Sequence, residues 1–116
     1  MTPFGARLRE LRRERGVTLA EMAKALGVSS AYLSALEHGR RGKPSRQRLH
    51  QIVGYFNIIW DEADALIALA ERSDPKVEVD TSGLSPDHTE LANLLARRIR
   101  TLSPTRIRQL IDMLNR

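Results

Sequence analysis

Basic side chains crowd into one short stretch of the sequence. Arg40, Arg41, Lys43 and Arg46 lie within seven residues, in a loop that also contains Gly42 and Pro44. Exposed guanidinium and ammonium groups neutralise phosphates, and such contacts position a protein on nucleic acid without reading its sequence. A solvated, charged loop with no ligand is the alternative interpretation. The stretch therefore favours a polyanionic partner.

The charge of the whole chain is distributed unevenly. Its 116 residues carry a formal net charge of +5, of which residues 1–60 contribute +7, residues 61–90 contribute −7 and residues 91–116 contribute +5. A basic first half is expected of a protein that binds a polyanion, because neutralising phosphates releases counterions. A solvated basic surface fits the charge alone equally well.

The sequence contains no residue pattern typical of metal binding, cofactor binding or catalysis. Cysteine is absent, which excludes disulfides and thiolate metal sites. The three histidines have no partner at metal-ligand spacing, and the acidic residues after Trp60 suit a helix start better than an acid–base pair. No phosphate loop, dinucleotide fingerprint or nucleophile elbow occurs. We therefore expect no metal, no cofactor and no enzymatic activity.

Apolar residues at helical spacing, bounded by capping residues, predict five helices in the first 72 residues. The first carries Phe4, Leu8 and Leu11 and ends at Gly16. The second begins at Thr18, where Thr18 and Glu21 form a capping box, and ends at Gly27. The other three are predicted over 29–39, 45–57 and 61–72, the last with Asp61 and Asp64 as a capping pair. We expect Ile58, Ile59 and Trp60, just before it, to lie in the core.

The last third predicts a linker and two more helices. Residues 73–84 are polar, and only the alternating Val77 and Val79 suit a short strand. Ser-Pro pairs at 85–86 and 103–104 start the two helices. Their apolar stripes are Leu91, Leu94, Leu95 and Ile99 on the first, and Ile107, Leu110, Ile111 and Leu114 on the second. Two such helices cannot bury both stripes alone, so they must pack on the first domain or on a second copy.

The two helices on either side of Gly27 are spaced to cross closely. Ala23, Val28, Leu33 and Leu36 fall at the predicted crossing, and the small Ala23 lets the second helix approach. This geometry leaves the outer face of the second helix projecting from the protein.

At these positions the sequence resembles the Cro/cI-like, or XRE-type, family of helix-turn-helix transcription regulators. The resemblance covers roughly residues 4–70 and rests on Arg12, Thr18, Ala23, Gly27-Val28-Ser29, Tyr32-Leu33-Ser34, Leu36-Glu37, Gly39 and Pro44. It implies an all-α fold, with a five-helix lambda-repressor-like DNA-binding bundle over 1–72. A linker at 73–84 and a C-terminal helical pair at 85–116 would follow.

The resemblance also implies residue roles, by position. A recognition helix over 29–38 would enter the major groove, with its base-facing residues at Ser29, Ser30, Ala31, Tyr32, Ser34 and Ala35. Phosphate contacts would come from Thr18, His38, Arg40, Arg41, Lys43 and Arg46. Serine tolerates several bases and alanine offers only its methyl group, so we expect specificity to depend also on DNA shape, half-site spacing or Tyr32. Simple capping by the serines, and a phosphate bond from Tyr32, are the alternatives.

Two further positions stand out in this resemblance. Arg12 and Glu37 would form an ion pair that joins the first helix to the third, unless both are solvated charges of little energetic weight. Leu19 departs from the family pattern, in which many members place a glutamine that contacts a phosphate. Either that contact is lost or Leu19 packs against the protein.

The resulting expectation is a cytoplasmic, nucleoid-associated homodimer that binds double-stranded DNA as a repressor. No apolar run is long enough to span a bilayer and no signal peptide is visible, so no membrane role is expected. The eight stripe residues of 85–116 would form the dimer interface. Alternatively, those stripes bind a different protein, as in an antitoxin-like adaptor. The arginines between 97 and 108 would contact flanking DNA, pair with the acidic middle segment, or remain solvated.

Overall fold

Seven α-helices account for most of the chain, and it contains no strand. The computed structural model describes every residue from 1 to 116. The helices are α1 (Pro3–Arg15), α2 (Leu19–Leu26), α3 (Ser30–Glu37), α4 (Arg46–Phe56), α5 (Trp60–Glu71), α6 (Pro86–Arg98) and α7 (Pro104–Leu114), with a 3₁₀ turn at Ile99–Thr101. The all-α prediction is confirmed. The strand considered at Val77 and Val79 is wrong, since neither residue has a strand to pair with and both side chains are exposed.

Local capping fixes where the helices begin and end. Thr18 caps α2, and its hydroxyl accepts from the Glu21 N–H while the Glu21 carboxylate accepts from the Thr18 N–H, which completes the predicted capping box. Gly27 takes a left-handed φ of 72° after α2, so the chain turns sharply into α3. Serine side chains cap four other helices, at Ser29, Ser45, Ser85 and Ser103.

The start of α5 differs from the prediction. The helix begins at Trp60, with Ile59 in the N-cap position and no side-chain cap, so the expected capping pair of Asp61 and Asp64 does not form. Only Ile58 of the preceding apolar residues is buried, whereas Ile59 is 63% and Trp60 81% exposed. The short connection after the left-handed Asn57 turns a single side chain inward, so the placement of Ile59 and Trp60 in the core is wrong.

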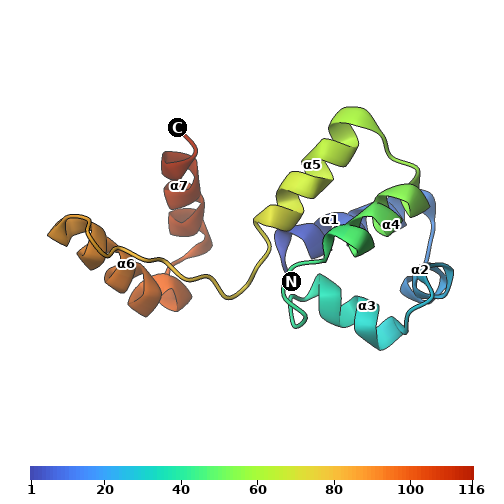
Figure 1. Cartoon of the computed structure of the whole chain (residues 1–116), viewed down its shortest axis with the longest axis horizontal. Coiled ribbons are helices and arrows are strands. Elements are labelled where there is room, and N and C mark those ends of the chain that lie inside the picture. The colour runs from blue at the N-terminus through green and yellow to red at the C-terminus, as the bar shows by residue number, and fades with distance from the viewer. The chain divides into compact units, whose positions relative to one another are not determined.

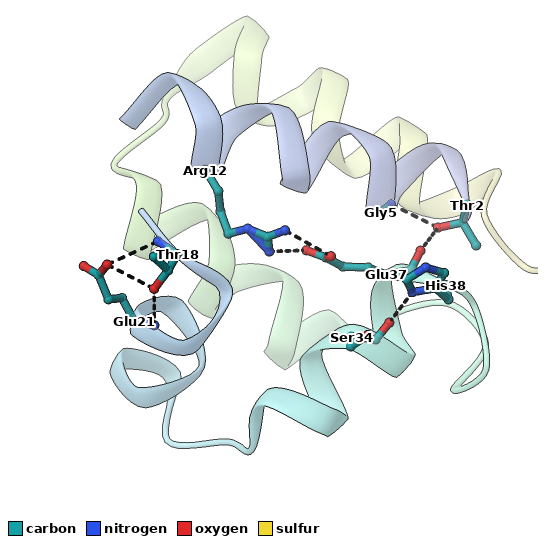
Figure 2. Close-up of polar contacts among 8 residues, drawn as sticks. All are labelled: Thr2, Gly5, Arg12, Thr18, Glu21, Ser34, Glu37 and His38. Carbon is teal, nitrogen blue, oxygen red and sulfur yellow. Dashed lines mark hydrogen bonds and ion pairs between the residues drawn. The ribbon is translucent and has the colours of Figure 1, made fainter. Parts of the chain in front are cut away.

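The chain divides into two compact units, Met1–Val77 and Glu78–Arg116, of which the first holds α1 to α5 (Figure 1). Within that unit α1 lies between α3 and α5 and packs against both (Figures 1 and 2). Its core consists of Phe4, Leu8, Leu11, Met22, Ala23, Leu33, Leu36, Leu49, Ile52, Phe56, Ile58, Leu66 and Ala70. Ser73 also belongs to it, because its buried hydroxyl accepts from the Phe4 N–H at 2.9 Å. The first unit therefore extends past residue 72, into the segment expected to be linker.

The second unit has no buried core of its own. Neither α6 nor α7 contains a buried residue. Leu91, Leu94, Leu95, Ile99, Ile111 and Leu114 are exposed, and Ile107 and Leu110 are half-buried. The two helices thus do not bury their apolar stripes against each other. None of the chain's helices combines the length and the apolar character that a membrane-spanning segment needs.

Candidate nucleic-acid interface

The crossing of α2 and α3 holds α3 against the core by its inner face. Ala23 and Leu33 are fully buried there, and Leu36 is 2% exposed. Val28, in the turn between the helices, is partly buried against the same core. Leu19 packs against it as well, so this departure from the family pattern serves packing. The inner face of α3 is therefore held in place, and its outer face is the part that can meet a ligand.

The outer face of α3 carries the six residues predicted to face bases. Ser29, Ser30 and Ala31 are exposed, and Tyr32, Ser34 and Ala35 are partly exposed. The Ser29 hydroxyl accepts from the Tyr32 N–H at 3.0 Å, so its oxygen already serves as the helix cap. The face thus presents small hydroxyl and methyl groups over the first turns of the helix and one aromatic ring.

A buried ion pair ties α3 to α1. Arg12 Nη1 lies 2.7 Å from Glu37 Oε2, and Arg12 Nη2 lies 3.3 Å from Glu37 Oε1 (Figure 2). The two side chains are 9% and 2% exposed. Burial raises the pKa of the Glu37 carboxyl, and the charge of Arg12 opposes this shift without cancelling it. Desolvation offsets much of the attraction in a buried pair, so we expect the bidentate geometry to matter more for the direction of α3 than for net stability.

A second connection joins the same two helices through their backbones. The Thr2 N–H and hydroxyl both donate to the Glu37 carbonyl, at 3.1 and 3.3 Å, and the hydroxyl accepts from the Gly5 N–H (Figure 2). A Cβ atom on Gly5 would lie 1.9 Å from the Glu37 carbonyl oxygen. Glycine at position 5 is therefore what allows this end of α3 to reach α1. Sequence reasoning missed this residue, although a glycine inside a predicted helix is a signal of close backbone approach.

The residues predicted to contact phosphates divide into two groups. Arg40, Arg41 and Arg46 are exposed and take part in none of the chain's ion pairs. His38 donates from Nδ1 to the Ser34 carbonyl at 2.9 Å, which leaves Nε2 as the ring atom for a ligand (Figure 2). The three arginines can bind an anion as they stand, whereas Nε2 of the neutral His38 ring is an acceptor and can donate to an anion only when that ring is protonated.

The other two predicted phosphate contacts are engaged within the protein. The Thr18 hydroxyl donates to the Glu21 carboxylate at 3.0 Å. Lys43 Nζ lies 3.4 Å from Glu71 Oε2, which draws this ammonium group to α5. A phosphate would have to displace a carboxylate at each of these positions.

Arg48 is a basic residue that sequence reasoning left out of the site. Its guanidinium carbon lies 5.2 Å from the centroid of the Tyr32 ring, and that of Arg41 lies 5.4 Å from the same centroid. Arg48 Nη1 also donates to Gln51 Oε1 at 2.7 Å. The available signal was its place in the first turn of α4, two residues after Arg46. The structure thus brings a loop arginine and a helix arginine together over one residue of α3.

The arrangement as a whole suits a long polyanion better than a small substrate. A projecting helix with small polar side chains lies beside several cations that no carboxylate neutralises. No group of three or more histidine or acidic side chains is placed to hold a metal ion. The face can therefore offer hydrogen bonds and methyl contacts along α3, and charge along its border.

Comparisons with known proteins place the chain among DNA-binding regulators. The model of the family described as "Helix-turn-helix domain" matches residues 3–66. The uncharacterized HTH-type transcriptional regulator RghRB of Bacillus subtilis is 38% identical over 61 residues, which are 53% of this chain and 44% of that protein. The HTH-type transcriptional repressor RghR of the same organism is 36% identical over 61 residues, covering 53% and 45%. This chain therefore aligns with less than half the length of these two curated relatives.

One relative matches over most of both chains. The HTH-type transcriptional regulator DdrOP3 of Deinococcus deserti is 33% identical over 103 residues, which are 88% of this chain and 79% of that protein. The alignment therefore extends beyond the first unit into the C-terminal helices.

Proposed function

Because the chain belongs to the Cro/cI-like, or XRE-type, helix-turn-helix family of transcription regulators, we propose that it is a dimeric repressor that places α3 in the major groove of double-stranded DNA. The observation that carries the proposal is the outer face of α3, which projects small polar side chains beside uncompensated cations. B-DNA admits an α-helix in its major groove, where hydroxyl and methyl groups meet base edges. Repression is supported by the name of the relative RghR.

Base contacts in this proposal come from the hydroxyl and methyl groups of α3. Ser30 and Ala31 lie in the first turn of the helix, and both are exposed. Neither side chain can make the bidentate contact that arginine or glutamine makes, so each half-site is read weakly. DNA shape and the spacing of half-sites would supply the remaining specificity. Arg40, Arg46 and His38 would bind phosphates and fix the register of the helix.

Dimerisation in this proposal occurs through the C-terminal unit. Its helices α6 and α7 leave their two apolar stripes uncovered by each other, and neither helix contains a buried residue. Pairing two copies would remove these stripes from water, which is the main favourable term in association. The interface would be formed by Leu91, Leu94, Leu95, Ile99, Ile107, Leu110, Ile111 and Leu114. Two recognition helices would then lie about 34 Å apart, one turn of B-DNA.

The same open stripes fit a different protein as well as a second copy. In that case the chain would act as an antitoxin-like adaptor whose DNA binding regulates its own production. The two arrangements differ in their DNA site, because a chain that does not dimerise reads a single half-site. In either case DNA as the target would place the protein on the nucleoid, in the cytoplasm.

A charge placed on the recognition face tests the major-groove role. We expect Ala31→Glu to weaken DNA binding by at least about 100-fold, because a carboxylate facing phosphates and base acceptors costs several kcal/mol. Folding should be unaffected, since Ala31 is exposed in the first turn of α3, where an acidic residue is favourable. The measurement is fluorescence anisotropy with labelled duplex DNA, together with the melting temperature of each protein.

Ala65→Glu is the matched control. Ala65 is exposed on α5. This helix packs against α1, on the side of α1 opposite to α3 (Figures 1 and 2). This variant should bind DNA within about twofold of the unmodified chain, since surface substitutions away from a contact change free energies by about 0.5 kcal/mol or less. An equal loss of DNA affinity in both variants would indicate a non-specific charge effect. Unchanged DNA affinity in Ala31→Glu would exclude α3 from the interface.

A further inference from the structure

Tyr32 is the only aromatic residue on the outer face of α3, and its ring is already in contact with charged groups. The guanidinium carbons of Arg41 and Arg48 stand 5.4 and 5.2 Å from its ring centroid. Both distances lie within the range of cation–π attraction, which is about 6 Å. A base that stacked on this ring would have to compete with the guanidinium groups for it.

The two arginines come from different elements and have no negative partner. Arg41 lies in the loop after α3, and Arg48 lies in the first turn of α4. None of the chain's ion pairs includes either residue. Their neighbour Lys43, in contrast, is paired with Glu71. Two like charges gathered at one ring repel each other, and an anion between them would remove that repulsion.

The side chain of Arg48 and the backbone of Tyr32 are further restrained. Arg48 Nη1 donates to Gln51 Oε1 at 2.7 Å, which holds the guanidinium group near the first turn of α4. The Tyr32 N–H donates to the cap residue Ser29, which fixes this turn of α3. Arg41 has no such restraint apart from the Tyr32 ring. The ring is thus the group that both guanidinium groups contact, and it is the contact that orients Arg41.

We propose that Tyr32 is a positioning residue that gathers Arg41 and Arg48 into a two-guanidinium site for one stretch of the DNA phosphate backbone, and that its hydroxyl reads no base. This inference rests on the proposed DNA-binding function and deepens it. It assigns Arg48 to the interface and moves Tyr32 from base readout to phosphate binding. Planar guanidinium groups match phosphate oxygens in a bidentate manner, which suits the two arginines to this ligand.

Salt dependence distinguishes a phosphate site from a base-reading residue. We expect Arg41→Gln and Arg48→Gln each to lower the slope of log affinity against log salt by about 1, with the same loss of affinity for every DNA sequence. Arg13→Gln is the control, since Arg13 is an exposed arginine of α1 that forms no ion pair. Its salt slope should equal that of the unmodified chain.

Variants of Tyr32 separate the ring from the hydroxyl. Tyr32→Phe keeps the ring, so affinity, salt slope and preferred sequence should stay unchanged. Tyr32→Leu removes the ring and should weaken binding to all sequences by one common factor. In the Tyr32→Leu background, Arg41→Gln should then cost much less affinity than in the unmodified chain, because the arginine has already lost its orientation. A merely structural role for Tyr32 would leave the effect of Arg41→Gln unchanged.

The outcomes separate this inference from the function on which it rests. If the unmodified chain binds DNA and neither arginine variant changes the salt slope, the phosphate site is wrong while the DNA-binding function stands. A changed sequence preference in Tyr32→Phe would likewise overturn it, because the hydroxyl would then read a base. If Tyr32→Leu does not fold, the arginine variants and Tyr32→Phe still decide the question. Failure of the unmodified chain to bind any duplex would instead contradict the proposed function.

Discussion

Gly5→Ala is expected to destabilise the first unit by about 3 kcal/mol or more, the upper end of the range for overpacking. The added methyl group would lie 1.9 Å from the Glu37 carbonyl oxygen and 2.6 Å from its carbonyl carbon. These are backbone atoms at the end of α3, so no side-chain rotation relieves the clash. Relief requires α1 and α3 to separate, which also breaks the hydrogen bonds from Thr2 to the Glu37 carbonyl. The measurement is the free energy of unfolding from urea titration followed by circular dichroism.

Gly54→Ala is the matched control for this prediction. Gly54 lies within α4, is exposed, and an added Cβ would meet no atom within 4 Å. Alanine is favoured over glycine in a helix interior by about 0.5–1 kcal/mol, so this variant should be more stable than the unmodified chain. Changes of opposite sign in the free energy of unfolding, for the same glycine-to-alanine substitution, would establish the contact between α1 and α3. A Gly5→Ala protein as stable as the control would show that these backbones do not touch.

Removal of one partner of the Arg12–Glu37 pair is expected to cost about 3–5 kcal/mol of stability, because the remaining buried charge loses its counterion. The pair is 9% and 2% exposed, so water cannot take the place of the missing partner. Glu37→Ala should therefore lower the melting temperature and the DNA affinity together, since α3 loses the contact that sets its direction. Differential scanning calorimetry gives the melting temperature, and fluorescence anisotropy on the same samples gives the DNA affinity.

Replacing both partners tests what the pair contributes. We expect Arg12→Met combined with Glu37→Leu to fold with nearly the stability of the unmodified chain, because two apolar groups remove the desolvation cost that raises the pKa of Glu37. DNA affinity should remain reduced in this double variant, since α3 then keeps only its packing and its backbone hydrogen bonds from Thr2 and loses the directional side-chain contact to α1. Unchanged stability in Glu37→Ala alone would mean that the pair has no structural role. Full DNA affinity in the double variant would mean that packing alone orients the helix.

The features that the sequence predicted well are those decided locally. Thr18 and Glu21 are three residues apart and form their capping box without help from the rest of the chain. Gly27 ends α2 because its left-handed conformation suits glycine. The buried set at the crossing of α2 and α3 follows from helical spacing, and Ala23 and Leu33 are fully buried as expected.

Contacts between residues far apart in the sequence could not be predicted from local sequence patterns. Arg12 and Glu37 are 25 residues apart, and their pairing was inferred from the family resemblance and not from spacing. Lys43 was expected to face DNA, yet it lies beside Glu71, which is 28 residues away. Trp60 was assigned to the core by its hydrophobicity, but the backbone after Asn57 turns it outward. In each case the result depends on how helices far apart in the sequence pack in three dimensions, and no periodicity in the sequence encodes it.

Selection from random-sequence duplex DNA with the full chain decides whether two copies of α3 read a two-part DNA site. We expect an enriched inverted repeat with half-site centres one helical turn apart, about 10 base pairs, bound with strong salt dependence. A single enriched half-site would contradict the dimer and favour a different protein as the partner of the C-terminal helices. No enrichment at all would contradict sequence reading by α3.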